Sequence, residues 1–341
     1  MGSSNDTINL EFIEEITREI YCLQDKDNAF CVFKSVHEIL FVAYPTIETS
    51  IVFYDIINKK KVLEIKKAHN SYIIEFRHYL DKINKNNERD LILTASYEDR
   101  NIKVWDFKNA ECIFNLKPYS KGTINSACFL FDNNINEILI ITSNLNGESI
   151  NVKESIKVFN LKGEEQKEIN ESDNETIFIE SYYDDNLHKN YIISANKYLV
   201  ISYDYEENKL YHKYEHSDIF DCTSIVIFNN KNDNKVKLIY STGDGIIKLW
   251  DFHLGVLLNQ IKVNPGYIFS ICLLDEKYLF SCGKYYKSEV VIINNEESKI
   301  KIIHINQEIT GKLIEHQKYG KCLITKSLDS DGPLKLWKIK Q

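Results

Sequence analysis

Short apolar runs alternate with polar turns along almost the whole chain. Four of these runs span residues 29–33, 39–44, 51–55 and 62–65, and similar runs recur towards the C-terminal end. Runs of this length, bounded by charged or Asn-rich turns, predict β-strands. Residues 8–23 have a different apolar spacing, and there we predict a short helical turn over 9–16 followed by a strand over 18–23. The sequence therefore predicts an all-β protein after its first residues.

One stretch, residues 91–107, shows the repeated unit most clearly. It predicts two strands, 91–96 and 102–107, separated by a polar turn over 97–101. The second strand ends in Trp105 followed by Asp106. Similar stretches return at 237–252 and 323–339, where Trp250 and Trp337 take the place of Trp105. The three tryptophans of the chain thus stand at one position of a repeat.

The aromatic position has a regular spacing. Aligned on Trp105, it is filled by residues that lie 43 to 54 residues apart, namely Tyr54, Trp105, Phe159, Tyr203, Trp250, Ile293 and Trp337. Asp or Asn follows in every unit except the last, where Lys338 stands. The two longest intervals contain polar insertions at 81–90 and 144–154, which surface loops accommodate at small cost.

A period near 40–45 residues, with four strands and an aromatic–Asp pair in each unit, resembles the WD-repeat β-propeller family. The resemblance covers about residues 28–339 and implies one seven-bladed propeller of four-stranded antiparallel blades. The blades are expected at 28–66, 69–117, 122–168, 175–214, 217–262, 266–305 and 309–339. The last unit has only three strands, so we expect the strand at 18–23 to complete it and close the ring. Residues 1–17 are then an N-terminal tail with the short helical turn.

The resemblance also implies structural hydrogen-bonded sets of His, Ser, Asp and Trp. The expected members are His69, Ser96, Asp99 and Trp105, then His216, Ser241, Asp244 and Trp250, and finally Asp331 and Trp337. Such a set satisfies buried polar groups and pins a loop to the sheet. Because the set recurs at the same offsets, we interpret it as structural, and we expect no catalytic residues.

Composition and charge narrow the class of function. The formal net charge is −8 and the pI is near 5.7, which argues against general nucleic-acid binding. No apolar run is long enough to cross a bilayer and no leader is recognised, so we expect a protein of the cytoplasm or nucleus without membrane insertion. The eight cysteines stand singly, without a metal-type pair. We therefore expect no metal and no cofactor.

Recognition of other proteins is the remaining class of function. In the family resembled, one face of the ring is built from the loops that precede each innermost strand and from the residue before the turn aspartate. This places nine residues on a prospective partner-binding face: Tyr72, Ile74, Glu98, Asn125, Phe178, Asp221, Tyr267, Phe269 and Ser330. Aromatic side chains often dominate interface energy, and the acidic residues favour a basic or mixed peptide.

We therefore expect a non-catalytic scaffold or adaptor, monomeric within a multiprotein complex, that binds proteins or peptides through this face. Three alternatives stay open. A ubiquitin-ligase substrate receptor of this family carries an Arg two residues after the Trp–Asp pair, where this chain has Lys108 and His253. A methyl-peptide reader would need an aromatic cage, which only the tyrosines could supply. A propeller enzyme would need a cluster of titratable groups at the channel mouth.

Overall fold

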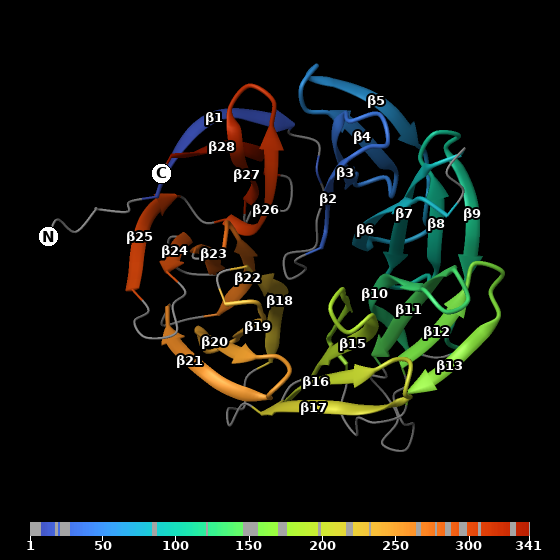
Figure 1. The fold of residues 1–341 in the computed structure, drawn as a ribbon. Coiled ribbons are helices and arrows are strands. Elements are labelled where there is room, and N and C mark those ends of the chain that lie inside the picture. The colour runs from blue at the N-terminus through green and yellow to red at the C-terminus, as the bar shows by residue number, and fades with distance from the viewer. Residues whose placement is uncertain are drawn as a thin grey trace, which may run out of the picture.

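The chain forms a β-propeller, a ring of four-stranded antiparallel sheets (Figure 1). The computed structural model describes residues 8–17, 20, 28–83, 87–120, 122–145, 156–169, 176–196, 199–215, 221–231, 233–263, 267–276, 278–283, 288–292, 299–305, 308–327 and 332–340. Within these ranges, 28 strands form seven sheets, each hydrogen bonded as a blade. The prediction of an all-β propeller built from such blades is confirmed.

Six blades are made from four consecutive strands. They are β2 (Cys31–Lys34), β3 (Leu40–Pro45), β4 (Ile51–Asp55) and β5 (Lys60–Ile65); β6 (Ile73–Asp81), β7 (Arg89–Ser96), β8 (Ile102–Asp106) and β9 (Glu111–Leu116); β10 (Thr123–Asp132), β11 (Glu137–Leu145), β12 (Ile156–Asn160) and β13 (Glu165–Ile169); β14 (Phe178–Asp184), β15 (Lys189–Ala195), β16 (Leu199–Asp204) and β17 (Lys209–Glu215); β18 (Cys222–Asn230), β19 (Lys235–Thr242), β20 (Ile246–Asp251) and β21 (Val256–Lys262); and β22 (Ile268–Leu273), β23 (Tyr278–Gly283), β24 (Ser288–Ile292) and β25 (Lys299–Ile305).

The remaining blade joins the two ends of the chain. It contains β26 (Glu308–His316), β27 (Gly320–Ser327), β28 (Leu334–Lys340) and, as its outermost strand, β1 (Asn9–Thr17). β1 runs antiparallel to β28, from the Asn9–Lys340 pair to the Thr17–Leu334 pair. The ring is therefore closed by an N-terminal strand, as predicted.

The position and type of that N-terminal segment were predicted wrongly. Residues 9–16 belong to β1 and form no helical turn, and the closing strand is 9–17 instead of 18–23. Within 18–23, only residue 20 is described. The apolar spacing around Ile13 and Ile16 suits a helix, but β1 has register shifts at 12–14 and 15–17. These bulges alter the two-residue alternation of a strand and so mimic a helical pattern.

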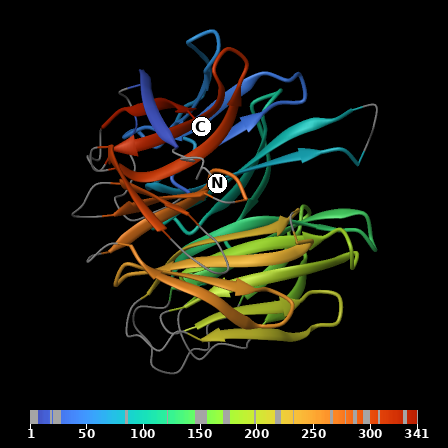
Figure 2. The same ribbon diagram turned by 60° about the vertical axis from the view of Figure 1, so that its left-hand side comes forward.

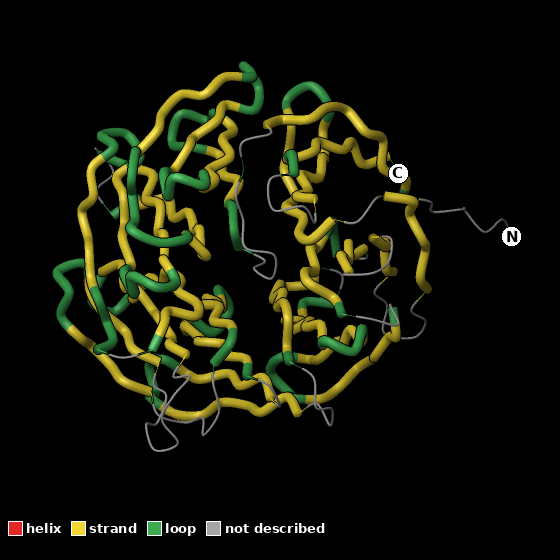
Figure 3. The backbone as a smooth tube through the Cα atoms, turned by 180° about the vertical axis from the view of Figure 1, so that it is seen from behind, coloured by secondary structure: helices red, strands yellow, loops and turns green. Residues whose placement is uncertain are grey.

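The innermost strands β2, β6, β10, β14, β18, β22 and β26 surround the centre, and the outermost strands form the rim (Figures 1 and 3). The core lies between successive blades. Phe107 illustrates this packing, because its ring contacts Phe33, Phe41 and Phe53 of the preceding blade, with centroids 4.8 to 5.6 Å apart. Burial of such large side chains between blades supplies most of the hydrophobic stabilisation.

The aspartates that follow the aromatic position end the third strand of a blade. Asp55, Asp106, Asp204 and Asp251 each accept a hydrogen bond through Oδ1 from a backbone amide three residues later, at 2.8 to 3.3 Å. A side chain that closes such a turn replaces a backbone acceptor. The repeated Asp is thus explained as the cap of the turn between the third and fourth strands.

Two faces follow from this topology. The upper face contains the segments that precede each innermost strand and the turns between second and third strands. The lower face contains the turns between first and second strands and between third and fourth strands. In Figure 2 the β6–β7 hairpin extends beyond its neighbours at one side of the ring. Because this hairpin turns between a first and a second strand, that side is the lower face.

Candidate functional site

The His69 set lies at the upper end of the β6–β9 blade, where two hydrogen bonds join Trp105, Thr94 and His69. The Trp105 indole donates to Thr94 Oγ1 at 2.9 Å, and Thr94 Oγ1 lies 2.9 Å from His69 Nε2. His69 Nδ1 lies 3.4 Å from Asp99 Oδ2. This arrangement favours the His69 tautomer with its proton on Nδ1, because Nε2 can then accept from the Thr94 hydroxyl.

The hydroxyl in this chain was predicted wrongly as that of Ser96. Trp105 pairs with Ile92 on the neighbouring strand, so Thr94, two residues further on, projects on the same face as the indole. Ser96 is buried, and its Oγ makes no hydrogen bond to the Trp105 indole, which donates to Thr94. The set therefore consists of His69, Thr94, Asp99 and Trp105.

Asp99 organises the upper-face loop. It accepts from the Asn70 amide through Oδ2 at 2.9 Å and from the Asn101 amide through Oδ1 at 3.1 Å. Burial acts to raise the Asp99 pKa, but the His69 side chain and the Asn70 amide outweigh it and hold the pKa well below its usual value. Burial lowers the pKa of His69, and Asp99 offsets that effect only in part. A neutral His69 beside an ionised Asp99 suits a structural link.

The other sets match in part. Trp337 donates to Thr325 Oγ1 at 2.8 Å, which reproduces the Trp105–Thr94 pair, while Asp331 lies outside the described residues. In the β18–β21 blade Tyr240 stands at the position of Thr94, and the buried Trp250 indole has no hydrogen-bond acceptor among the described residues.

The remaining members of the β18–β21 set are not joined as predicted. Ser241 hydrogen bonds to Thr223 at 2.7 Å, and Asp244 accepts from Thr242, its neighbour in the same turn. His216 lies outside the described residues. Ser241 thus links two neighbouring strands and Asp244 stabilises its own turn, and neither accepts from the Trp250 indole.

The prospective partner-binding face divides into exposed and buried members. Tyr72 is 39% exposed and Glu98 is exposed, whereas Asp221 and Tyr267 are partly exposed. The backbone links Tyr72 to the turn that carries Glu98, because the Tyr97 amide donates to the Tyr72 carbonyl at 3.1 Å. These four side chains reach the surface of the upper face. Ser330 lies outside the described residues.

The prediction was wrong for Ile74, Asn125, Phe178 and Phe269, whose side chains are buried. Ile74, Asn125 and Phe269 occupy register shifts near the start of β6, β10 and β22. At such a bulge two residues face one on the partner strand, and the backbone re-aims the extra side chain. Asn125, for example, donates to the Thr176 carbonyl of the next blade at 2.6 Å.

A largely buried charge network joins the innermost strands of two blades, and sequence reasoning missed it. Arg77 on β6 forms an ion pair with Glu75 at 2.8 Å and another with Glu180 on β14 at 2.7 Å. Burial would lower the Arg77 pKa, but the two carboxylates outweigh burial and raise it. Arg77 also lies over the Phe178 ring, 5.6 Å from its centroid. The sequence signal for it was two charged residues, Glu75 and Arg77, that alternate with apolar residues in β6.

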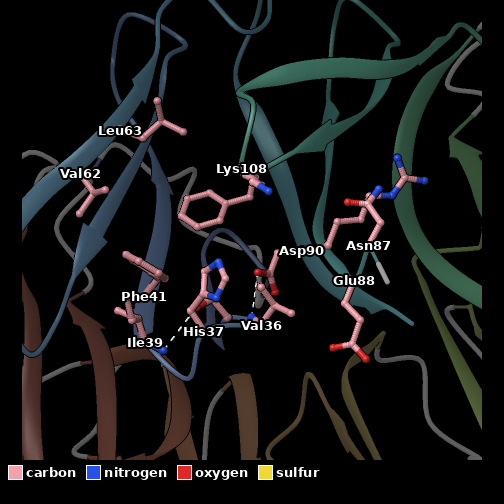
Figure 4. A pocket seen from close by; sticks show the side chains of 13 residues that line it. Val36, His37, Ile39, Phe41, Val62, Leu63, Asn87, Glu88, Asp90 and Lys108 are labelled. Carbon is pink, nitrogen blue, oxygen red and sulfur yellow. Dashed lines mark hydrogen bonds between the residues drawn. The ribbon is translucent and has the colours of Figure 1, made fainter. Parts of the chain in front are cut away.

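A pocket of about 570 Å³ opens at the lower face between the β2–β5 and β6–β9 blades (Figure 4). Ile39, Phe41, Val62 and Leu63 form an apolar wall on the first blade. Figure 4 shows Glu88 with Asn87 and Asp90 on the opposite side.

Asp90 ties the two walls of this pocket together. Its Oδ2 accepts from the Val36 amide of the first blade at 2.9 Å, and its Oδ1 lies 2.8 Å from His78 Nε2. The His78 ring in turn stacks on Phe33, with centroids 4.4 Å apart. The pocket is therefore a fixed junction of two blades, with its shape held by a buried carboxylate.

Two features are absent among the described residues. Within them, His, Cys, Asp and Glu side chains form no group of three or more that could hold a metal ion. The described part of the chain also has no helix that is long and apolar enough to cross a membrane.

Two comparisons with known proteins found no relative from which a function could be inferred, so the functional proposal rests on the geometry of the fold. A scan against protein-family models matched no family, and a search of curated proteins found no match.

Proposed function

We propose that this chain is a non-catalytic scaffold or adaptor that binds proteins or peptides through the upper face of its ring. The observation that carries the proposal is the position of Tyr72 and Glu98, which are both exposed and lie on loops joined by a backbone hydrogen bond. A fixed aromatic group beside a carboxylate is a suitable anchor for a partner. We place its action in the cytoplasm or nucleus.

The proposed partner is a basic or mixed peptide. Glu98 supplies a negative charge beside Tyr72, and Asp221 supplies another next to the turn of the β18–β21 blade, where the Gly243 amide donates to its carbonyl at 2.9 Å. Tyr267 adds a second partly exposed ring. Acidic groups around aromatic anchors favour positively charged partners through electrostatic complementarity.

We also propose that the chain is a WD-repeat protein. The support is the buried link from Trp105 through Thr94 to His69 and Asp99, together with its partial copy at Trp337 and Thr325. The capped turns after the third strands agree with the same repeat. On this proposal, the blades share an ancestral unit whose polar set persists in some copies only.

Affinity capture from cell lysate, read by mass spectrometry, tests the scaffold proposal. The full-length chain should retain a stable set of partners that the double variant Tyr72→Ala, Tyr267→Ala loses. Tyr183→Ala is the matched control, because this partly exposed tyrosine lies near the lower end of β14. Partners kept by the double variant would contradict the upper-face assignment. A folded bait without partners would favour an enzymatic role.

A further inference from the structure

The pocket between the β2–β5 and β6–β9 blades has the features of a binding site separate from the upper face. Its volume, about 570 Å³, falls within the range of ligand pockets. Two apolar side chains at its wall are exposed, Ile39 to 37% and Val62 to 48%. Leaving them in water costs free energy that an apolar occupant would recover.

Two charges of opposite sign border this apolar wall. Lys108 follows Phe107 in the turn after β8, and Glu88 precedes β7. Neither side chain forms a hydrogen bond or ion pair with another described residue, although Arg89, also at the pocket, is paired with Asp81 at 2.9 Å. An occupant can therefore pair with Lys108 and Glu88 without breaking a bond to any described residue.

The floor of the pocket is rigid, which favours selective binding. Phe41 is buried and contacts Phe107 at a centroid distance of 5.0 Å. Asp90 holds the Val36 backbone against the second blade. A preformed apolar cavity with charges at its edge reduces the entropy lost on binding.

We propose that this pocket binds an extended peptide segment of a partner protein. One large apolar side chain of the segment enters beside Val62 and Ile39, an acidic residue on one side of it pairs with Lys108, and a basic residue on the other side pairs with Glu88. The site lies on the lower face and is independent of the proposed upper-face site. The chain can thus hold two partners at once, one on each face.

Selection from a random peptide library on the immobilised full-length chain tests this proposal. Enriched peptides should share an apolar residue between an acidic and a basic residue. One enriched peptide is then synthesised with a fluorescent label, and its affinity is measured by anisotropy. Val62→Asp should weaken binding at least tenfold. Val256→Asp, at a valine that is 51% exposed on the outermost strand β21, should leave binding unchanged and is the matched control.

Charge-reversal variants test which charged residue of the peptide lies beside Lys108 and which lies beside Glu88. Lys108→Glu should change the enriched acidic position to a basic one, and Glu88→Lys should change the basic position to an acidic one. The Tyr72→Ala, Tyr267→Ala variant should bind the labelled peptide normally, which separates this site from the upper face. The proposal would be overturned if the same peptides were enriched on every pocket variant. It would also be overturned if no peptide were enriched and only small molecules raised the melting temperature.

Discussion

The indole ring of Trp250 stacks on the ring of Tyr240, with centroids 6.3 Å apart and planes inclined by 19°. In the β6–β9 blade, the residue at the Tyr240 position is Thr94, which accepts a hydrogen bond from the indole of Trp105. The tryptophan of the repeat is thus packed in two different ways. One satisfies the indole N–H, and the other replaces that bond with aromatic packing.

This difference predicts unequal costs for removing the indole N–H. Trp105→Phe should lower the free energy of unfolding by about 1 kcal/mol more than Trp250→Phe, because only the first loses a hydrogen bond. Urea denaturation of both variants measures the difference. Equal losses would mean that the Trp105–Thr94 bond has no net value.

Truncation of the same side chain should have a larger effect. Trp105 is 6% exposed, so Trp105→Ala should cost on the order of 3–5 kcal/mol through lost burial. Thermal melts followed by circular dichroism measure this loss. An unchanged melting temperature would contradict the placement of Trp105 in a blade core.

Closure by β1 predicts that the N-terminal strand is required for a folded ring. Deletion of residues 1–17 should give aggregated or unfolded protein, because it exposes the edge of β28. A point variant refines the test. Ile16 is 8% exposed and Phe12 is 50% exposed, so Ile16→Asp should destabilise the protein strongly and Phe12→Asp weakly. Size-exclusion chromatography and melting curves provide the readout, and a soluble, fully folded deletion variant would refute the closure.

The charge network of Arg77, Glu75 and Glu180 predicts a large penalty for removing its cation. Arg77→Met would leave the buried Glu75 and the partly buried Glu180 without their cation, at a cost of about 3–5 kcal/mol. The triple variant that also carries Glu75→Gln and Glu180→Gln should recover part of this loss. Lys340→Met is the control, because its ion pair with Glu11 is exposed and screened by solvent, so its loss should change stability little. Denaturant unfolding compares the variants, and similar losses for Arg77→Met and Lys340→Met would argue against a buried network.

The His69–Asp99 link predicts a loss of stability in mild acid. The His69 pKa is lowered from the ordinary 6.5 in the folded state, so below pH 6.5 the unfolded chain binds a proton more readily than the folded chain. Stability should therefore fall as pH decreases from 6.5 to the folded pKa of His69. Asp99 adds a second loss as pH falls below its ordinary value of 3.8, since its folded pKa is lowered.

The variant His69→Gln isolates the first of these effects. It should be less stable than the natural chain at pH 7, and its stability should change less between pH 7 and pH 5. His37→Gln is the control, because His37 is exposed at the lower face. Urea denaturation at several pH values measures the slopes. An unchanged slope for His69→Gln would remove this residue from the acid response.

The repeat and its aromatic position could be predicted from the sequence, because strand length and periodic burial are local properties. Tyr54, Trp105, Phe159, Tyr203, Trp250 and Trp337 all lie on the third strand of a blade. The bulges could not be predicted, since they depend on pairing with a neighbouring strand. They made β1 resemble a helix and turned Ile74, Asn125 and Phe269 inward.

The candidate sites were predicted less well for a related reason. Whether Thr94 or Ser96 accepts from the Trp105 indole depends on the register of β7 against β8. That register cannot be predicted from a local sequence pattern. The lower-face pocket joins residues 35–41, 62–63, 87–90 and 107–108, which come together only in the folded ring. Sequence periodicity identifies strands, whereas such contacts between blades require the assembled structure.

The pairing of Asn9 with Lys340 has a mechanical consequence. Because β1 and β28 are antiparallel and these two residues form one end of their ladder, a force that separates Asn9 from Lys340 breaks the hydrogen bonds one after another. A load applied between Thr17 and Lys340 would instead act along the strands and strain many bonds together. The ring should therefore open at low tension when pulled by its two ends and resist much higher tension in the second geometry.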